Sequence, residues 1–446
     1  MNWKRLREKV VEKNYPGEED LEEINKKYSE IAGFIEEEFG QETHFAGSAS
    51  RQTCMKDDRD IDLFVLFSPE KERKHLEDRG LKIGKKVFDE FNGEYEIEYA
   101  EHPYTKGIID GYEVEIVPCY KVESGKIKSA VDRTPHHSRW VQNNLDQEQR
   151  KDVVILKKFL SAAGIYGSSL KVQGFSGYLC EILISQYGEF KELTEEAKEW
   201  QEKTVIDPED QHEKLPEKLE NKFEDEPLVV IDPVDEERNV ASVMSKENFS
   251  KFIYLCWRFN EEPGMDFFQE EDRDYTEFEV KQELDRRGDM LVLEFETPEE
   301  VDDIVYPQMR KAMRRLKSEI EKHEFQVFDS GFHVGEMTRV FFELDRDLPE
   351  IQEKKGPKVF HGTDHIRQFT SKYDNVYVKD DKLVAKTERE YTDAKELLDE
   401  FLDGDLEAKG IPEYVANKIE DYSFSDALGP DEWLNYLGDK FNVEDN

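Results

Sequence analysis

The sequence predicts a multidomain protein in which an α/β domain is followed by a helical middle region and a C-terminal α+β region. Its 446 residues are enough for about three domains of roughly 150 residues. The hydrophobic pattern changes from mixed strand and helix periods to a helical period, and then to a strand-helix-strand-strand string. We expect the domains to cover residues 1–150, 151–260 and 261–446.

The composition indicates a folded cytoplasmic protein. Hydrophobic residues make up 37% and aromatic residues 12% of the chain, which argues against general disorder. No apolar run approaches the length of a membrane-spanning helix, and the first twenty residues lack the apolar core of a secretory signal. The four cysteines are far apart, so we expect reduced, mostly buried thiols at Cys54, Cys119, Cys180 and Cys256.

The charge is strongly acidic, with 63 Lys and Arg against 105 Asp and Glu, a net of −42. At low ionic strength such a chain should repel a nucleic acid. In a saline cytoplasm the Debye length falls to about 3 Å, and surface carboxylates then serve solubility instead. Charge alone leaves both interpretations open.

The N-terminal region predicts an α/β unit. Apolar residues at three- and four-residue spacing indicate a helix that ends at Gly40. The further expected elements are strands 43–46, 60–67, 94–101 and 112–118 and a helix over 70–91.

The middle region predicts three helices, one from about Asp152 to Gly164, one starting near Ser176, and one over 246–259. The segment 202–229 is polar and poor in periodicity, so we expect an exposed excursion there.

The C-terminal region predicts a ferredoxin-like α+β domain followed by a tail. A strand over 290–296, a helix over 302–323, and strands near 325–330 and 338–345 form a β-α-β-β string. Beyond it we expect strands 375–378 and 382–386, a helix over 391–402, and a Gly- and Asp-rich end.

The stretch GSASRQTCMKDDRDID (47–62) carries the strongest chemical signal. Strand alternation places Asp60 and Asp62 on one face and Ile61, Leu63 and Val65 on the other. Two neighbouring carboxylates cannot be buried unpaired without a large cost. Mg²⁺ resolves this, because it prefers carboxylate oxygens and accepts substrate phosphates as further ligands.

A second acidic strand, YEVEIVP (112–118), repeats the pattern with Glu113 and Glu115 on one face. If it pairs beside the first strand, Glu115 supplies a third ligand for two metal ions, the arrangement for in-line phosphoryl transfer. Gly47 and Ser48 precede the first strand at a turn where a backbone can approach a phosphate. Each signal is weak alone, and their combination is specific.

This Gly-Ser, Asp-x-Asp and acidic-strand order resembles the polymerase-β-type nucleotidyltransferases, and it implies a polymerase-β-like palm domain at the N-terminus. Longer stretches resemble the archaeal class I CCA-adding enzymes, the tRNA nucleotidyltransferases. The resemblance is strong from about 40 to 260 and continues loosely to VDDIVYPQ (301–308). The stretches that carry it are EYAEHPYTKG (98–107), EVEIVPCYKV (113–122), IKSAVDRTPHH (127–137), LKKFLSAAGIYG (156–167), VQGFSGYLCEILI (172–184), KTVIDP (203–208) and VIDPVDEERNVA (230–241).

The resemblance implies a set of site residues. Two Mg²⁺ ions would be held by Asp60, Asp62 and Glu115, where the family usually has Asp at the third position. The implied nucleotide-binding residues are Ser48, Arg51, His137, Lys157 and Tyr166, and Arg238 is implied to read the incoming base.

Each of these residues also has a plain structural interpretation. His137 could be a solvated loop histidine, Lys157 a charge on an exposed helix face, and Tyr166 a core aromatic. Arg238 could instead be paired with Asp235 or Glu236.

A basic helix stands out near 308–323. Its expected buried stripe is Met309, Met313, Leu316 and Ile320, and beside it lie Arg310, Lys311, Arg314, Arg315 and Lys317. The stripe is either a salt-bridged surface or a surface that follows tRNA phosphates.

The resemblance implies CTP- and ATP-dependent addition of C, C and A to the tRNA 3′ end without a nucleic-acid template, with release of pyrophosphate. It also suggests a homodimer, no membrane partner and, given the charge, a salt-accumulating archaeal cell. The alternatives are a poly(A) polymerase-like terminal transferase and a non-catalytic tRNA-binding protein.

Overall fold

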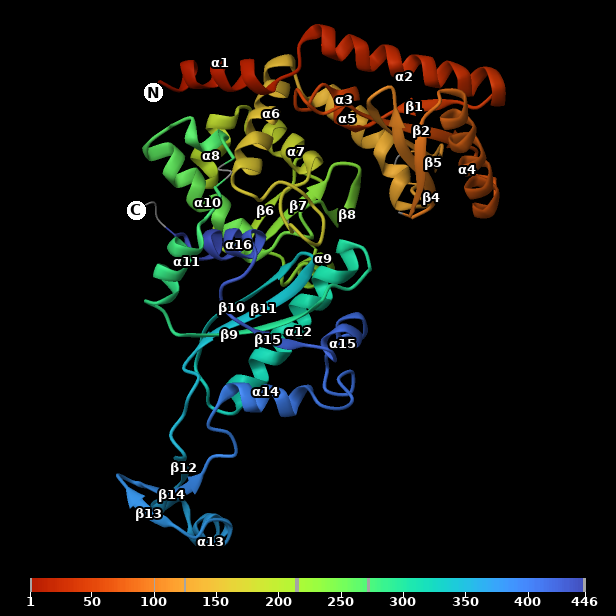
Figure 1. Ribbon diagram of the computed structural model, residues 1–446. Coiled ribbons are helices and arrows are strands. Elements are labelled where there is room, and N and C mark those ends of the chain that lie inside the picture. The colour runs from red at the N-terminus through yellow and green to blue at the C-terminus, as the bar shows by residue number, and fades with distance from the viewer. Residues whose placement is uncertain (1, 100, 124–125, 213–215, 271–272, 444–446) are drawn as a thin grey trace. The chain divides into compact units, whose positions relative to one another are not determined.

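The structure is a computed structural model that describes residues 2–99, 101–123, 126–212, 216–270 and 273–443. The chain divides into two compact units, Met1–Glu271 and Asp272–Asn446 (Figure 1). The first unit holds a mixed sheet and a helical region, and the second holds antiparallel sheets with helices. The predicted fold class is confirmed.

The sheet of the first unit has the strand order β1-β2-β5-β4-β3. β2 and β5 run parallel, and the other neighbours are antiparallel. The strands are β1 (Thr43–Phe45), β2 (Asp60–Phe67), β3 (Glu94–Tyr99), β4 (Pro103–Ile109) and β5 (Tyr112–Tyr120). The predicted strands are therefore present, with β2 at its predicted bounds.

β4 was not expected, because Pro103 and Gly107 argue against a strand interior. The proline stands at the first position of the strand, where a missing N–H costs least. A Cβ on Gly107 would lie 1.9 Å from the carbonyl oxygen of Glu94, so glycine permits the close approach of β3. The strand predicted over 94–101 ends at Tyr99, and Ala100 lies outside the described residues.

Helices α2 (Glu18–Phe39) and α4 (Arg73–Glu90) pack on one face of this sheet (Figure 1). Their apolar residues share a core with Ile61, Leu63 and Val65, which are fully buried. The alternation predicted for β2 is thus confirmed, and the acidic residues at its start belong to the other face.

The helical region is built around a second core. Its helices are α1 (Trp3–Asn14), α5 (Thr134–Asn144), α6 (Gln147–Ala162), α7 (Gly177–Tyr187), α8 (Phe190–Ala197) and α10 (Lys246–Glu261). α6 starts five residues before Asp152 because Asp146 caps it, accepting a hydrogen bond from the Gln149 amide. α1, α5 and α8 were not predicted. α1 packs in this core and pairs Arg7 with the buried Asp152.

The segment 202–229 is exposed over much of its described length, as expected, but it also contains secondary structure that was not predicted. It holds β6 (Thr204–Ile206) and α9 (Glu217–Lys222), and it leads into β7 (Leu228–Asp232), which pairs with β8 (Asp235–Asn239). Leu219 and Phe223 are buried against β7, but two apolar residues among so many charges give little periodicity. Residues 213–215 lie outside the described residues.

The main sheet of the second unit has the order β10-β11-β9-β15, with every pair antiparallel. Its elements are β9 (Asp289–Glu296), α12 (Asp302–Lys322), β10 (Val327–Val334), β11 (Met337–Leu344) and β15 (Ser423–Ser425). The first strand lies between the third and the last, which is the ferredoxin-like order. This part of the prediction is confirmed.

A smaller sheet of order β12-β14-β13 is inserted after β11 (Figure 1). It comprises β12 (Ile351–Lys358), β13 (Val376–Lys379) and β14 (Lys382–Glu388), with α13 (Thr363–Lys372). The remaining helices of the unit are α11 (Glu277–Leu284), α14 (Ala394–Leu402), α15 (Glu413–Ile419) and α16 (Asp431–Phe441). The end expected to be only Gly- and Asp-rich therefore supplies α15, β15 and α16, and Trp433 is fully buried.

All four cysteines are free and buried, as expected. Burial raises the pKa of the Cys54 thiol to about 11, so it stays protonated near neutral pH. None of the helices in the described part of the chain is both long and apolar enough to cross a bilayer.

Candidate functional site

Two parallel strands bring the predicted carboxylates together. In the β2–β5 pair, Asp60 lies opposite Glu113 and Asp62 lies opposite Glu115. Because side chains alternate along a strand, all four project from the face that α2 and α4 leave uncovered. The pairing on which the third ligand depended is confirmed.

Lys106 of β4 completes this group, and sequence reasoning missed it. β4 lies on the other side of β5, where Lys106 is opposite Glu115. Its Nζ is 2.5 Å from Glu113 Oε1 and 3.1 Å from Glu115 Oε1. Burial tends to lower the pKa of Lys106, but the bonds to the two glutamates outweigh it and raise that pKa. One ammonium therefore bonds both glutamates and offsets one of their two negative charges.

The two aspartates have no such partner. Within the described residues, the carboxylates of Asp60 and Asp62 accept no hydrogen bond and form no ion pair. Burial, together with the charge of Glu115, raises the pKa of Asp62 to about 6, while Arg51 acts in the opposite direction. Burial and the charge of Asp58 also raise the pKa of Asp60. Among the described residues, neither aspartate is paired with a basic side chain.

A divalent ion fits this donor set. Across the described ranges, no group of three or more His, Cys, Asp or Glu side chains is arranged to hold a metal as it stands. The third acid, Glu115, is engaged by Lys106 instead. Asp60 and Asp62 offer hard oxygens that no described residue pairs, on one strand face, and a dication would offset the burial and the repulsion from Glu115 that raise the pKa of Asp62.

The turn before β2 approaches the same carboxylate. Gly47 has φ of +68° and begins α3 (Gly47–Arg51). A Cβ at Gly47 would lie 1.6 Å from Asp62 Oδ2, so only glycine leaves room for the carboxylate here. Ser48 follows directly, and its hydroxyl bonds to no described residue. The predicted approach of a phosphate to this turn stays a prediction.

Arg51 lies in a buried charge network below α3. Its Nε is 2.8 Å from Oε1 of Glu181 on α7, and its Nη1 donates to Ser138 at 3.2 Å. Thr53 Oγ1 donates to the same Glu181 oxygen at 2.5 Å, and Glu181 Oε2 has no hydrogen-bond partner. The network links the sheet to the helical region.

Lys157 joins this network from α6. Its side chain is only 1% exposed, and its Nζ donates to the carbonyl oxygen of Thr53 at 2.7 Å. The Tyr166 ring centroid is 6.0 Å from the same Nζ. The alternative of an exposed helix charge is therefore wrong for Lys157. With Arg51 and one glutamate, the buried network carries one surplus positive charge.

His137 and Arg238 meet at a residue that the sequence did not single out, Asp232. His137 lies on α5, and its Nε2 is 2.9 Å from Asp232 Oδ2. Arg238 Nη1 lies 2.7 Å from the same oxygen. The His137 ring stacks on Tyr178, with centroids 4.0 Å apart. His137 is thus no solvated loop residue, and the partner of Arg238 is neither Asp235 nor Glu236.

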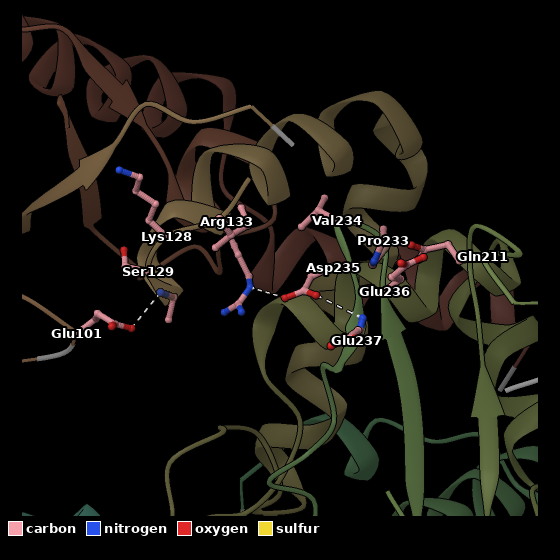
Figure 2. A pocket seen from close by; sticks show the side chains of 12 residues that line it. Glu101, Lys128, Ser129, Arg133, Gln211, Pro233, Val234, Asp235, Glu236 and Glu237 are labelled. Carbon is pink, nitrogen blue, oxygen red and sulfur yellow. Dashed lines mark hydrogen bonds and ion pairs between the residues drawn. The ribbon is translucent and has the colours of Figure 1, made fainter. Parts of the chain in front are cut away.

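A cavity of about 750 Å³ opens beside this group (Figure 2). One wall comes from residues 127–130 and Arg133, and the other from Gln211 and residues 233–237. Arg133 Nε bonds Asp235 Oδ2 at 2.9 Å, as Figure 2 shows. The predicted carboxylates do not line this cavity, so the chemistry of the β2–β5 face is separate from it.

The basic helix α12 belongs to the second unit. Met309, Leu316 and Ile320 are fully buried, and Met313 is partly buried. Arg315 pairs with Glu319 at 2.9 Å, and Lys317 is 3.9 Å from Glu321. Arg314 Nε donates to the carbonyl oxygen of Arg310, while Lys311 is exposed. Part of the stripe is therefore salt-bridged.

Three known families match successive parts of the chain. The nucleotidyltransferase domain matches residues 26–137, the second domain of tRNA nucleotidyltransferase matches 151–269, and the C-terminal domain of the CCA-adding enzyme matches 286–423. A CCA-adding enzyme of Methanocaldococcus jannaschii is 41% identical over 419 residues, covering 91% of this chain and 92% of the relative. The chain belongs to the archaeal CCA-adding enzymes. It is therefore a tRNA nucleotidyltransferase of the polymerase-β-like superfamily, whose members use a divalent metal.

Other CCA-adding enzymes are nearly as similar. That of Archaeoglobus fulgidus is 37% identical over 83% of each chain, and that of Haloarcula marismortui is 34% identical over 89% of this chain and 87% of the relative. Among solved structures, a Cid1 poly(U) polymerase with Mg and 3′-dATP bound matches at a TM-score of 0.50 and 12% identity, over 60% of this chain and 98% of that one. This likeness concerns the fold alone.

The site residues that sequence reasoning did not identify in this CCA-adding enzyme are those that hold the predicted site residues in place. Lys106, Asp232 and Glu181 each hold a predicted site residue, through bonds that join distant segments. The available signal for Lys106 was its place on a strand next to YEVEIVP, and that strand itself was not recognised.

Proposed function

We propose that this chain adds C, C and A to the 3′ end of tRNA from CTP and ATP, with its chemistry at the acidic face of β2 and β5. Family membership supports the reaction, and the unpaired Asp60 and Asp62 carboxylates support the place. The division into catalytic (1–150), nucleotide-binding (151–260) and tRNA-binding (261–446) parts belongs to this proposal, as do a cytoplasmic location and a homodimer.

Asp60, Asp62 and Glu115 would hold two Mg²⁺ ions. Ions bound there would supply Lewis acidity, which would lower the pKa of the RNA 3′-hydroxyl and stabilise the charge of the leaving pyrophosphate. Asp60 and Asp62 are available as ligands, since no residue in the described part of the chain bonds their carboxylates. Glu115 can join them through Oε2, because Lys106 contacts its other oxygen, Oε1, at 3.1 Å.

The triphosphate would be held by Ser48, Arg51, Lys157 and Tyr166. The surplus positive charge of the network at α3 favours a polyanion, because Arg51 and Lys157 are both buried and only Arg51 is paired with a carboxylate, that of Glu181, while Lys157 donates to the Thr53 carbonyl oxygen. The Ser48 hydroxyl is available as a donor. These groups make no covalent bond, and they orient the α-phosphate and stabilise its charge in the transition state.

The base would be read by Arg238, with His137 beside it. Arg238 is 36% exposed at its side chain and uses one nitrogen for Asp232, so other N–H groups remain available. The tRNA would be bound partly by α12, where Arg310, Lys311, Arg314, Arg315 and Lys317 cluster in an otherwise acidic chain.

The observation that carries the proposal is the Asp60–Asp62 pair opposite an acidic strand in a chain of this family. The test is incubation of the protein with tRNA lacking its 3′ CCA, together with Mg²⁺, CTP and ATP, with product length measured at nucleotide resolution. A product three nucleotides longer is expected. An open-ended A tail would indicate a poly(A) polymerase-like enzyme, and unchanged tRNA would indicate a non-catalytic binding protein.

A further inference from the structure

We propose that Asp232 is a specificity-determining positioning residue, which fixes the Arg238 guanidinium so that only N–H donors face the incoming base. The inference rests on the proposed function, because it assumes that Arg238 reads the base during nucleotide addition.

Asp232 is a fully buried carboxylate whose two oxygens are both occupied. Oδ2 contacts Arg238 Nη1 at 2.7 Å and His137 Nε2 at 2.9 Å. Oδ1 accepts from the Tyr178 hydroxyl at 3.3 Å and from the Val234 amide at 3.1 Å. A buried charge persists only when hydrogen bonds replace its lost water, and Asp232 meets this condition.

Three of the four donors are side chains that come from different elements of the unit, and the fourth, the Val234 amide, lies in the turn after Asp232. His137 lies on α5, Tyr178 on α7, and Arg238 on β8, while Asp232 ends β7. Asp232 therefore fixes a side chain of the sheet hairpin relative to two helices. It touches no reacting atom itself, and it acts through the groups that it holds.

The guanidinium nitrogens of Arg238 that Asp232 does not engage can only donate hydrogen bonds to a base. Arginine has five N–H donors and no acceptor, and Nη1 is the nitrogen that Asp232 engages. At the centre of their pairing edges, cytosine and adenine present a bare ring nitrogen, N3 and N1. Uracil and guanine present an N–H at the corresponding positions. A fixed guanidinium is thus complementary to C and A, and it sets donor against donor for U and G.

Fixing the guanidinium is what makes this difference effective. An arginine side chain that nothing holds populates many rotamers, so it can turn away from a mismatched N–H. An asparagine at 232 would offer one oxygen and an NH₂ group, which cannot accept from Arg238 or His137. Loss of the carboxylate should therefore reduce discrimination between bases more than it reduces binding of the triphosphate.

The test compares Asp232→Asn with Asp152→Asn, a matched control in which a buried aspartate also loses its arginine partner, Arg7. The kcat/KM for a single addition is measured for CTP and UTP on tRNA lacking CCA, and for ATP and GTP on tRNA ending in CC. We expect the C-over-U and A-over-G ratios to fall at least tenfold in Asp232→Asn and to change less than threefold in Asp152→Asn.

Whether Asp232 acts through Arg238 is tested with the double variant Asp232→Asn, Arg238→Ala. If Asp232 acts by holding Arg238, the double variant should discriminate no worse than Arg238→Ala alone. If Asp232→Asn does not fold, Asp232→Glu keeps the charge, displaces the carboxylate, and should lower both ratios by at least threefold. Unchanged ratios in the folded variant would overturn the inference. A wild-type protein that adds no nucleotide would refute the proposed function, and the inference with it.

Discussion

Two carboxylates of the first unit, Asp62 and Asp232, both lie on strands and are both shielded from water, but they differ in their hydrogen-bond partners. Asp62 on β2 bonds to no described side chain, and burial with the nearby Glu115 raises its pKa to about 6. Asp232 on β7 is fully buried, which alone would raise its pKa, yet its bonds to His137 and the Val234 amide and the charge of Arg238 lower it.

The difference shows how the two groups can be used. A carboxylate without donors is held in an unfavourable state that a cation relieves, so it suits a metal ligand. A carboxylate whose two oxygens both accept hydrogen bonds has a structural role, because it orients the donors around it. The two cases cannot be distinguished by residue type alone.

The largest effect should come from Asp62→Asn. The variant removes a metal-ligating charge, so incorporation of both CTP and ATP should fall by more than about 100-fold, while tRNA binding stays within about twofold. In metal-free buffer the same variant should melt at a higher temperature than the wild type, because it removes an unpaired charge. Single-turnover incorporation and thermal unfolding in EDTA measure the two effects, and activity within tenfold of wild type would contradict the site assignment.

Arg238→Ala should alter the base-reading group around Asp232 and leave the metal-binding face around Asp62 intact. The lost base contact is worth about 1–3 kcal/mol, so UTP and GTP should be misincorporated or C and A addition should fall together. The matched control is Arg7→Ala, which removes a different arginine from a buried aspartate. Nucleotide competition at equal concentrations gives the selectivity. An equal loss for all four nucleotides with unchanged selectivity would mean that Arg238 only supports the fold.

The net charge of −42 should make both the stability of the fold and the rate of CCA addition depend on salt. Unscreened carboxylates repel each other and the tRNA, so folding and CCA addition should each rise, by several-fold for activity, between about 0.1 M and 1 M KCl as the Debye length falls from about 10 to about 3 Å. Thermal unfolding and activity across one KCl series measure this. Full activity at 0.1 M that declines as salt is added would show that the acidity is no saline adaptation.

Lys106→Met should produce the smallest change, a shift of a few degrees. It leaves Glu113 and Glu115 uncompensated beside Asp60 and Asp62, so the metal-free protein should unfold at a lower temperature. Added Mg²⁺ should then stabilise the variant more than the wild type, because it meets more unpaired charge. Melting curves with and without Mg²⁺ give both shifts. An equal Mg²⁺ shift in the two proteins would separate Lys106 from the metal-binding face.

The sequence was sufficient to predict a structural element or the family wherever a local hydrophobic period or a motif indicates it. The bounds of β2 and its buried face followed from DIDLFVLF, since strand alternation depends only on neighbouring residues. The pairing of β2 with β5 entered the sequence analysis only as a condition, which the structure meets. The ferredoxin-like order followed from the β-α-β-β string, and the family from motifs that run in order along the chain.

The sequence was insufficient where the decisive bond joins distant segments. The contact from Arg51 to Glu181 spans 130 positions and that from His137 to Asp232 spans 95, and no local pattern marks such pairs. β4 was hidden by Pro103 and Gly107, and with it Lys106. The buried state of Lys157 was also unexpected, because its charge suits an exposed helix face equally well.

Binding of Mn²⁺, a paramagnetic substitute for Mg²⁺, tests the contrast between the two carboxylates most directly. Electron paramagnetic resonance of the free ion gives its affinity in wild-type protein, Asp62→Asn and Asp232→Asn, without any need for activity. We expect Asp62→Asn to weaken binding at least tenfold, and Asp232→Asn to bind within twofold of wild type. Equal binding in Asp62→Asn and the wild type would contradict the assignment of the β2–β5 face as the metal site.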